Sequence, residues 1–119
     1  MYDFARYYQA ERLQQAKELL HNHQRAKIIA GGTDLLVKIS KKAAPDLKLI
    51  GINRIKQLKN ITLRQDGAIE IGCLAVFSQI EEDRIIKKYL PALAQAAAAM
   101  GGPQIRNVAT IGGNLCNGA

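Results

Sequence analysis

The sequence contains no tryptophan, only two phenylalanines, and no basic run longer than two residues. Binding to single-stranded nucleic acid relies on aromatic faces for stacking and on clustered basic residues, and this chain, with 5% aromatic residues, is short of both. Its net charge of +7 indicates a preference for anions in general. We predict a solvated basic surface and no nucleic-acid partner, with a small basic phosphate- or nucleic-acid-binding module as an alternative.

Cysteine is also scarce, since Cys73 and Cys116 are the only two. Two cysteines do not make a disulfide framework, and an iron–sulfur cluster takes about four thiolates. We therefore predict that both are small buried apolar residues. His21 and His23 have no cysteine or carboxylate beside them, which predicts a solvated helix end and no metal site.

Long apolar stretches are missing as well. No run approaches the roughly 20 residues that a membrane helix requires, and the opening MYDFARYYQAERL lacks the apolar segment of a secretion signal. These absences predict no membrane partner and a cytoplasmic location. The final GNLCNGA, residues 113–119, is typical of a loop rather than of an element docked on a core, which predicts that the chain is C-terminally truncated.

The first half of the chain shows a β-α-β pattern. Residues 10–20 have the apolar spacing of an amphipathic helix, and 27–30 form a short β-branched strand. Thr33 suits the N-cap of a helix over 34–39, and 47–52 alternates as a second strand. This order favours a parallel pair of strands.

The second half has a different character. Residues 60–64 and 68–72 read as a hairpin, with Asp66-Gly67 as the turn signal. Helical segments follow at 77–82, 84–88 and 90–100, and Pro91 fits the first turn of the last one. The sequence therefore predicts an α+β fold made of two small α/β lobes, 1–55 and 56–119.

Two glycine pairs suggest a ligand. Gly31-Gly32 follows a strand and precedes a capped helix, an arrangement that exposes backbone N–H groups to an anion. Alone, such a pair is more often only a turn, and neither a GxGxxG fingerprint nor a Walker loop is present. A second pair, Gly112-Gly113, has Thr110 before it and Asn114 after it. Two such loops suit the two anionic groups of one diphosphate.

Four segments carry a resemblance to a known family: YDFARYYQA, AGGTDLL, IGCLAVFSQIEED and GGPQIRNVATIGGNLCNGA. In their order and spacing they resemble the FAD-binding subunit of bacterial xanthine dehydrogenases, within the molybdenum hydroxylase family. The resemblance implies a PCMH/vanillyl-alcohol-oxidase-type FAD-binding domain with the flavin between two subdomains. Residues 1–55 would be the first FAD-binding lobe and 56–119 the incomplete start of the second.

The resemblance also implies which residues bind FAD, in two segments. They are Lys27, Ile28, Ile29, Ala30, Gly31, Gly32, Thr33 and Asp34 in the first, and Ala109, Thr110, Ile111, Gly112, Gly113 and Asn114 in the second. No catalytic residue and no metal ligand is implied in this chain. The chain departs from the family pattern at Val76, where threonine is common, at Gly51, where aspartate is usual, and in its length.

The function implied is electron transfer in purine metabolism. A molybdenum cofactor in a molybdopterin-binding subunit hydroxylates the purine, and electrons pass through [2Fe–2S] clusters in an iron–sulfur subunit to FAD, which reduces NAD⁺. We expect an oxidoreductase subunit whose 119 residues are inactive alone and bind FAD weakly or not at all. The alternatives are FAD subunits of the carbon monoxide, nicotinate or aromatic-CoA type.

Overall fold

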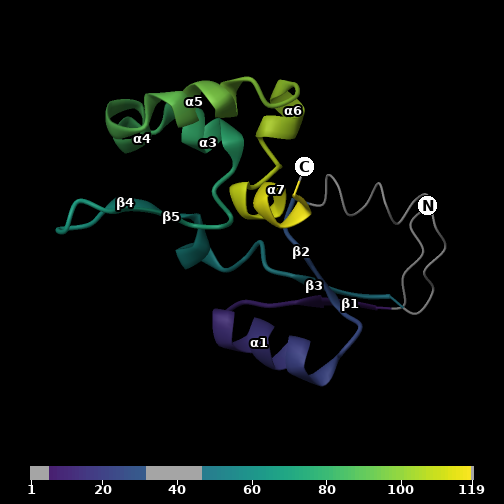
Figure 1. The fold of residues 1–119 in the computed structure, drawn as a ribbon. Helices are drawn as coiled ribbons and strands as arrows, with labels where there is room; N and C mark the ends of the chain where they lie inside the picture. Colours follow the sequence, from purple (N-terminus) through teal and green to yellow (C-terminus); the bar gives the residue numbers. More distant parts are fainter. Residues whose placement is uncertain (1–5, 32–46, 119) are drawn as a thin grey trace. The chain divides into compact units, whose positions relative to one another are not determined.

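The computed structural model describes residues 6–31 and 47–118 (Figure 1). The chain divides into two compact units, Met1–Ile55 and Lys56–Ala119. Each unit combines helices with strands. None of the helices within 6–31 and 47–118 is long and apolar enough to cross a membrane.

The first unit is built on a three-stranded parallel sheet. Strands β1 (Arg6–Gln9), β2 (Lys27–Ile29) and β3 (Lys48–Gly51) lie in the order β1-β3-β2. Tyr8 and Ile28 both pair with Ile50 on the central strand, and Ile50 is completely buried. The predicted parallel pairing of β2 with β3 is confirmed. Strand β1 was not predicted, because RYYQ has no apolar alternation of its own.

Helix α1 (Leu13–Asn22) contacts β3 and buries Ala16. It begins three residues later than the predicted start at residue 10. The helix ends at Asn22, and the N–H of its C-cap residue, His23, donates to the carbonyl of Leu19 at 3.0 Å. The imidazole of His23 stacks on the ring of Tyr8 with centroids 4.5 Å apart, so this histidine packs on β1, whereas His21 is exposed. The helix predicted over 34–39, with its cap at Thr33, lies outside the described residues.

Gly51, at the end of β3, lies beside two side chains of β1. A Cβ placed on Gly51 would overlap the hydroxyl of Tyr7, and it would lie 3.1 Å from Oε1 of Gln9. The Tyr7 hydroxyl donates to that same Gln9 oxygen at 2.7 Å. The side chains of β1 therefore fill the space that a side chain at position 51 would need.

The second unit opens with a short 3₁₀ helix, η1 (Lys56–Lys59), and the predicted hairpin. Strands β4 (Ile61–Leu63) and β5 (Ile69–Ile71) pair antiparallel. Gly67 has φ +88°, and its N–H donates to the carbonyl of Arg64 at 3.0 Å. Asp66 accepts from the N–H of Ala68 at 3.0 Å. This is a turn that closes through a left-handed glycine, which the Asp-Gly signal predicts.

Helices α3 (Phe77–Glu82), α4 (Arg84–Tyr89) and α5 (Pro91–Ala98) follow close to their predicted bounds. Asp83 caps α4 by accepting from the N–H groups of Ile85 and Ile86 at 2.9 and 3.1 Å, and Pro91 begins α5. Two further helices, α6 (Pro103–Arg106) and α7 (Ile111–Asn117), complete the unit. The sequence predicted loops at both places.

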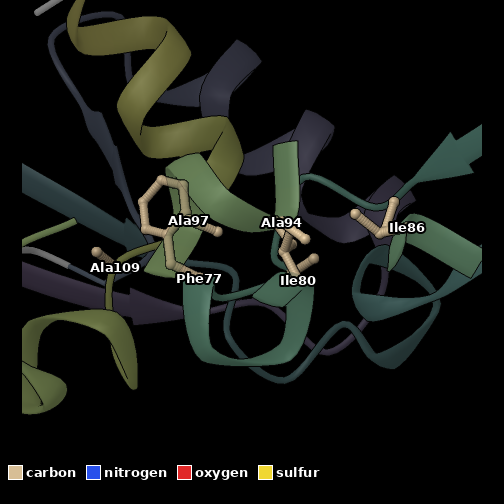
Figure 2. Close-up of a cluster of buried hydrophobic side chains, with 7 residues drawn as sticks. Phe77, Ile80, Ile86, Ala94, Ala97 and Ala109 are labelled. Carbon is tan, nitrogen blue, oxygen red and sulfur yellow. The ribbon is translucent and has the colours of Figure 1, made fainter. Parts of the chain in front are cut away.

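The core of this unit lies between α3 and α5. Figure 2 shows Phe77 and Ile80 of α3 with Ala97 and Ala94 of α5, in a cluster that also includes Ile86 and Ala109. The two buried alanines are three positions apart and therefore share one face of α5. Small side chains on this face let the two helices approach closely, and Phe77 is the largest side chain of the cluster.

Candidate functional site

The second predicted FAD-binding segment, Ala109 to Asn114, is anchored on the chain that leads into α3. Val76 and Thr110 form an antiparallel bridge, in which the N–H of Phe77 donates to Ala109 at 3.2 Å and that of Ile111 to Ala75 at 3.0 Å. Ala109 and Thr110 are buried, at 8% and 4% exposure. The residues that lead into α7 are therefore held by backbone hydrogen bonds and shielded from solvent.

Thr110 is the N-cap of α7. Its hydroxyl oxygen accepts from the N–H of Gly113 at 3.1 Å, and its carbonyl accepts from the N–H of Asn114 at 3.1 Å. The prediction that the chain is a loop from Gly113 onward is wrong, because a capped helix already runs from Ile111 to Asn117. Asn114 lies inside this helix and does not cap one.

The two glycines of this segment have different surroundings. Gly112 donates to the carbonyl of Cys73 at 2.9 Å, and a Cβ on Gly112 would lie 2.7 Å from both the Cβ and the carbonyl oxygen of Cys73. Gly113 is exposed, and a Cβ there would meet only the hydroxyl oxygen of Thr110, at 3.0 Å. The absence of a side chain at Gly112 thus allows α7 to pack closely on Cys73, whereas at Gly113 it exposes the backbone to solvent.

The amides of the first turn of α7 already have acceptors within the chain. Those of Ile111, Gly112 and Asn114 donate to the carbonyls of Ala75, Cys73 and Thr110. That of Gly113 donates to the Thr110 side chain. An anion at this turn would meet backbone that is approachable at Gly113 and a threonine hydroxyl that keeps its own hydrogen to donate. It would not meet the row of unpaired amides on which the sequence argument relied.

The first predicted segment is described only in part. Lys27, Ile28 and Ile29 form β2, and Ala30 and Gly31 follow half-buried at its carboxyl end. Ligands of parallel sheets bind outside the carboxyl ends of the strands, so Ala30 and Gly31 are well placed for one. Gly32, Thr33 and Asp34 lie outside the described residues. Because the two segments belong to different units, their meeting on one diphosphate stays a prediction.

Arg106 supports the entry to the second segment, and no pattern in the sequence predicted this role. Its Nη1 donates to the carbonyls of Gly101 and Met100 at 2.8 and 3.4 Å. Its Nε lies 3.8 Å from Oε1 of Glu81, with side-chain exposures of only 19% and 22%. One guanidinium therefore ties the glycine turn before α6 to helix α3.

Both cysteines differ from their predicted state. Cys73 and Cys116 are exposed, so the prediction of two buried apolar residues is wrong. Partial burial of its thiol, together with a smaller effect from Cys116, raises the pKa of Cys73 above its ordinary value of 9.0, and a hydrogen bond to the backbone opposes the rise. Among the residues that the structure describes, no group of three or more His, Cys, Asp or Glu could hold a metal ion.

Comparison with known proteins identifies the family. Residues 2–119 match the model for the FAD binding domain in molybdopterin dehydrogenase. The chain is 45% identical over 119 residues to the xanthine dehydrogenase FAD-binding subunit of Escherichia coli O157:H7, covering 100% of this chain and 41% of that protein. It is 42% identical over 118 residues to the nicotinate dehydrogenase FAD-subunit of Eubacterium barkeri, covering 97% and 39%. The chain belongs to this family of FAD-binding domains.

Solved structures agree with that assignment. Carbon monoxide dehydrogenase from Hydrogenophaga pseudoflava superposes with a TM-score of 0.90 at 34% identity, over 99% of this chain and 41% of that one. Quinoline 2-oxidoreductase from Pseudomonas putida 86 gives 0.89 at 25% identity, over 97% and 40%. These matches confirm the predicted fold class, the family resemblance and FAD as the cofactor. The chain spans about two fifths of the length of the relatives it matches.

Proposed function

We propose that this chain contributes the diphosphate-binding part of the FAD subunit in a xanthine-dehydrogenase-type molybdenum hydroxylase. The observation that carries the proposal is the Thr110-capped turn of α7, with Gly113 exposed at its surface, in a chain that is 45% identical to a xanthine dehydrogenase FAD-binding subunit. When bound, FAD would supply the electron-transfer chemistry that links iron–sulfur clusters to NAD⁺. The residues of this chain bind and orient the cofactor.

Each residue of the turn has a separate task in this proposal. The hydroxyl of Thr110 accepts from Gly113 and donates its hydrogen to a phosphate oxygen. Gly113 lets the phosphate approach the backbone closely, because no Cβ stands on that face. Gly112 positions the turn by packing on Cys73, and the half-buried Asn114 adds a side-chain amide on the same turn.

The first segment, Lys27 to Asp34, completes the proposed site. Ala30 and Gly31 would face the same diphosphate from the carboxyl end of β2, and Gly32, Thr33 and Asp34 would continue that contact. Two anion-binding segments match the two phosphates of the FAD diphosphate better than one segment does. The meeting of the two segments is part of the proposal.

The partners proposed are a molybdopterin-binding subunit and an iron–sulfur subunit, in a cytoplasmic complex that uses NAD as electron acceptor. Xanthine as the substrate class is supported by identity, at 45% against 42% for the nicotinate dehydrogenase relative. This margin is small. FAD subunits of the nicotinate or carbon monoxide type are therefore the alternatives, and the neighbouring reading frames decide among them.

The test is a titration of the purified chain with FAD, followed by the anisotropy of flavin fluorescence. We expect weak saturable binding, with Kd of about 0.1–1 mM, which Gly113→Val abolishes because its side chain covers the exposed backbone. Gly102→Val is the matched control, since Gly102 is also exposed and a Cβ there meets nothing closer than 4.0 Å. Equal affinity of Gly113→Val and Gly102→Val for FAD would contradict the proposal.

A further inference from the structure

We propose that Cys73 and Cys116 are a reactive dithiol pair that closes to an intramolecular disulfide, tying α7 to the turn that precedes α3. The two residues are far apart in the sequence and come from different elements of the second unit. Three observations on these elements carry the proposal: the contact of Gly112 with Cys73, the position of Cys116 on α7, and the exposure of both residues.

Cys73 lies directly on α7. It occupies a tight turn in which the N–H of Ala75 donates to the carbonyl of Gly72 at 2.9 Å. Its own carbonyl accepts from Gly112 at 2.9 Å, and the Cβ of Cys73 is 2.7 Å from where a Cβ of Gly112 would stand. The side-chain face of α7 at position 112 is therefore the face on which Cys73 rests.

Cys116 lies on the same face of α7. It is four residues after Gly112, one turn further along a helix that runs from Ile111 to Asn117. Cβ atoms at this spacing are about 5–6 Å apart, and side chains of a helix lean toward its N-terminus. The Cys116 side chain thus leans toward position 112 and toward Cys73. The small contribution of Cys116 to the raised pKa of Cys73 agrees with this placement.

Both residues are exposed, so a small disulfide in solution reaches them. A metal site is a poorer explanation of the pair. Within residues 6–31 and 47–118 no third His, Cys, Asp or Glu joins them, and a structural zinc site takes about four ligands. Two neighbouring thiols without further ligands favour thiol–disulfide chemistry.

The reaction proceeds in two exchanges with a small-molecule disulfide such as glutathione disulfide. The Cys116 thiolate attacks one sulfur of that disulfide, forms a mixed disulfide and releases one glutathione thiolate. Cys73 then loses its proton to solvent and attacks the Cys116 sulfur, which releases the second glutathione. In total two protein thiols are oxidised and one glutathione disulfide is reduced to two thiols.

The environment of Cys73 sets the order of these steps. Its partly buried thiol has a raised pKa and stays protonated at neutral pH, and a protonated thiol is a poor nucleophile. Cys116, exposed on α7, is the thiol proposed to react first, and Cys73 resolves the mixed disulfide. The second step speeds up as the pH rises.

The consequence for the cofactor rests on the proposed function. A disulfide beneath Gly112 would restrain the turn that carries Thr110 and Gly113, so that the oxidised chain binds FAD more tightly than the reduced chain. The disulfide itself is detected without FAD. Failure of FAD binding and failure of the dithiol are thus separate results.

The experiment treats the full chain with glutathione disulfide at neutral pH, quenches with acid, alkylates free thiols and maps peptides without reduction. We expect a linked Cys73–Cys116 peptide, formed at least about tenfold faster in the folded chain than in urea, because folding raises the effective concentration of one thiol near the other. Cys73→Ser should instead retain glutathione on Cys116, and Cys116→Ser should react slowly. Stable glutathione on both cysteines of the folded wild type, or closure no faster than in urea, would overturn the proposal.

Discussion

The hydroxyl oxygen of Thr110 accepts a 3.1 Å hydrogen bond from the backbone N–H of Gly113. This bond joins the two residues that the proposed cofactor site uses most directly. It begins helix α7 in a stretch whose two glycines disfavour a helix. The stability of the turn and its capacity to bind a phosphate therefore depend on the same side chain.

Replacing Thr110 by valine keeps its shape and removes this cap. We expect the free energy of unfolding to fall by about 1 kcal/mol, the usual cost of losing an N-cap, while Thr110→Ser stays within about 0.5 kcal/mol of the wild type. Urea unfolding followed by circular dichroism measures both. Thr62→Val, at an exposed position of β4, is the control. If Thr62→Val lowers the free energy of unfolding as much as Thr110→Val does, the loss is not due to the missing N-cap.

Alanine at the two neighbouring glycines should give opposite results. Gly112→Ala places a methyl group 2.7 Å from Cys73, and such overpacking costs about 1–3 kcal/mol. Gly113→Ala is exposed and gains up to about 1 kcal/mol of helix propensity, reduced by the shift of Thr110 that it requires. Thermal melting curves compare the two. Equal destabilisation would show that position 112 does not pack as closely as the structure indicates.

Arg106 should act as a positioning residue through its carbonyl contacts. Arg106→Lys keeps the charge and removes the Nη1 group that donates to both Gly101 and Met100, so we expect the free energy of unfolding to fall by about 0.5–1.5 kcal/mol. Glu81→Gln should cost less, because its ion pair spans 3.8 Å.

The effect of Arg106→Lys on the proposed FAD site is measured at the Thr110-capped turn of α7. The NMR amide signals of Thr110 and Gly113 should move in Arg106→Lys, whereas Arg64→Lys, in the exposed hairpin, should leave them unchanged. Unmoved signals in Arg106→Lys would limit Arg106 to a local role.

The thiol of Cys73 predicts a specific dependence on alkaline pH. Because burial raises its pKa above 9.0 in the folded chain, the unfolded chain releases the proton first. The contribution to stability is present below pH 9.0 and is lost as the pH rises through the folded pKa. Reduced wild type should therefore lose more stability than Cys73→Ser between pH 8 and pH 10, in urea titrations at each pH. Parallel curves for the two proteins would contradict this.

Local chemistry explains which elements the sequence predicted. The hairpin of β4 and β5 depends on Asp66 and Gly67, whose turn preferences are intrinsic. The bounds of α3 and α4 follow from the apolar spacing and from the Asp83 cap. These features act within a few residues and are visible in the sequence without knowledge of the fold.

The elements that the sequence missed depend on distant contacts. Strand β1 exists because it pairs with β3, more than forty residues later. Helix α7 contains two glycines, each unfavourable in a helix by about 1 kcal/mol, and it forms because Gly112 packs on Cys73 and Thr110 is held by its bridge to Val76. The exposure of Cys73 follows from the same packing, since Cys73 contacts α7 at Gly112 and not the hydrophobic core.

The central claim is that both glycine segments contact one FAD diphosphate. The direct measurement is an amide NMR titration of the chain with FAD and, separately, with riboflavin, which has no phosphate. We predict that FAD shifts the signals of Ala30 and Gly31 and those of Thr110 and Gly113 with one common Kd, and that riboflavin shifts neither pair. FAD-induced shifts in only one segment, two unequal Kd values, or equal shifts with riboflavin would contradict it.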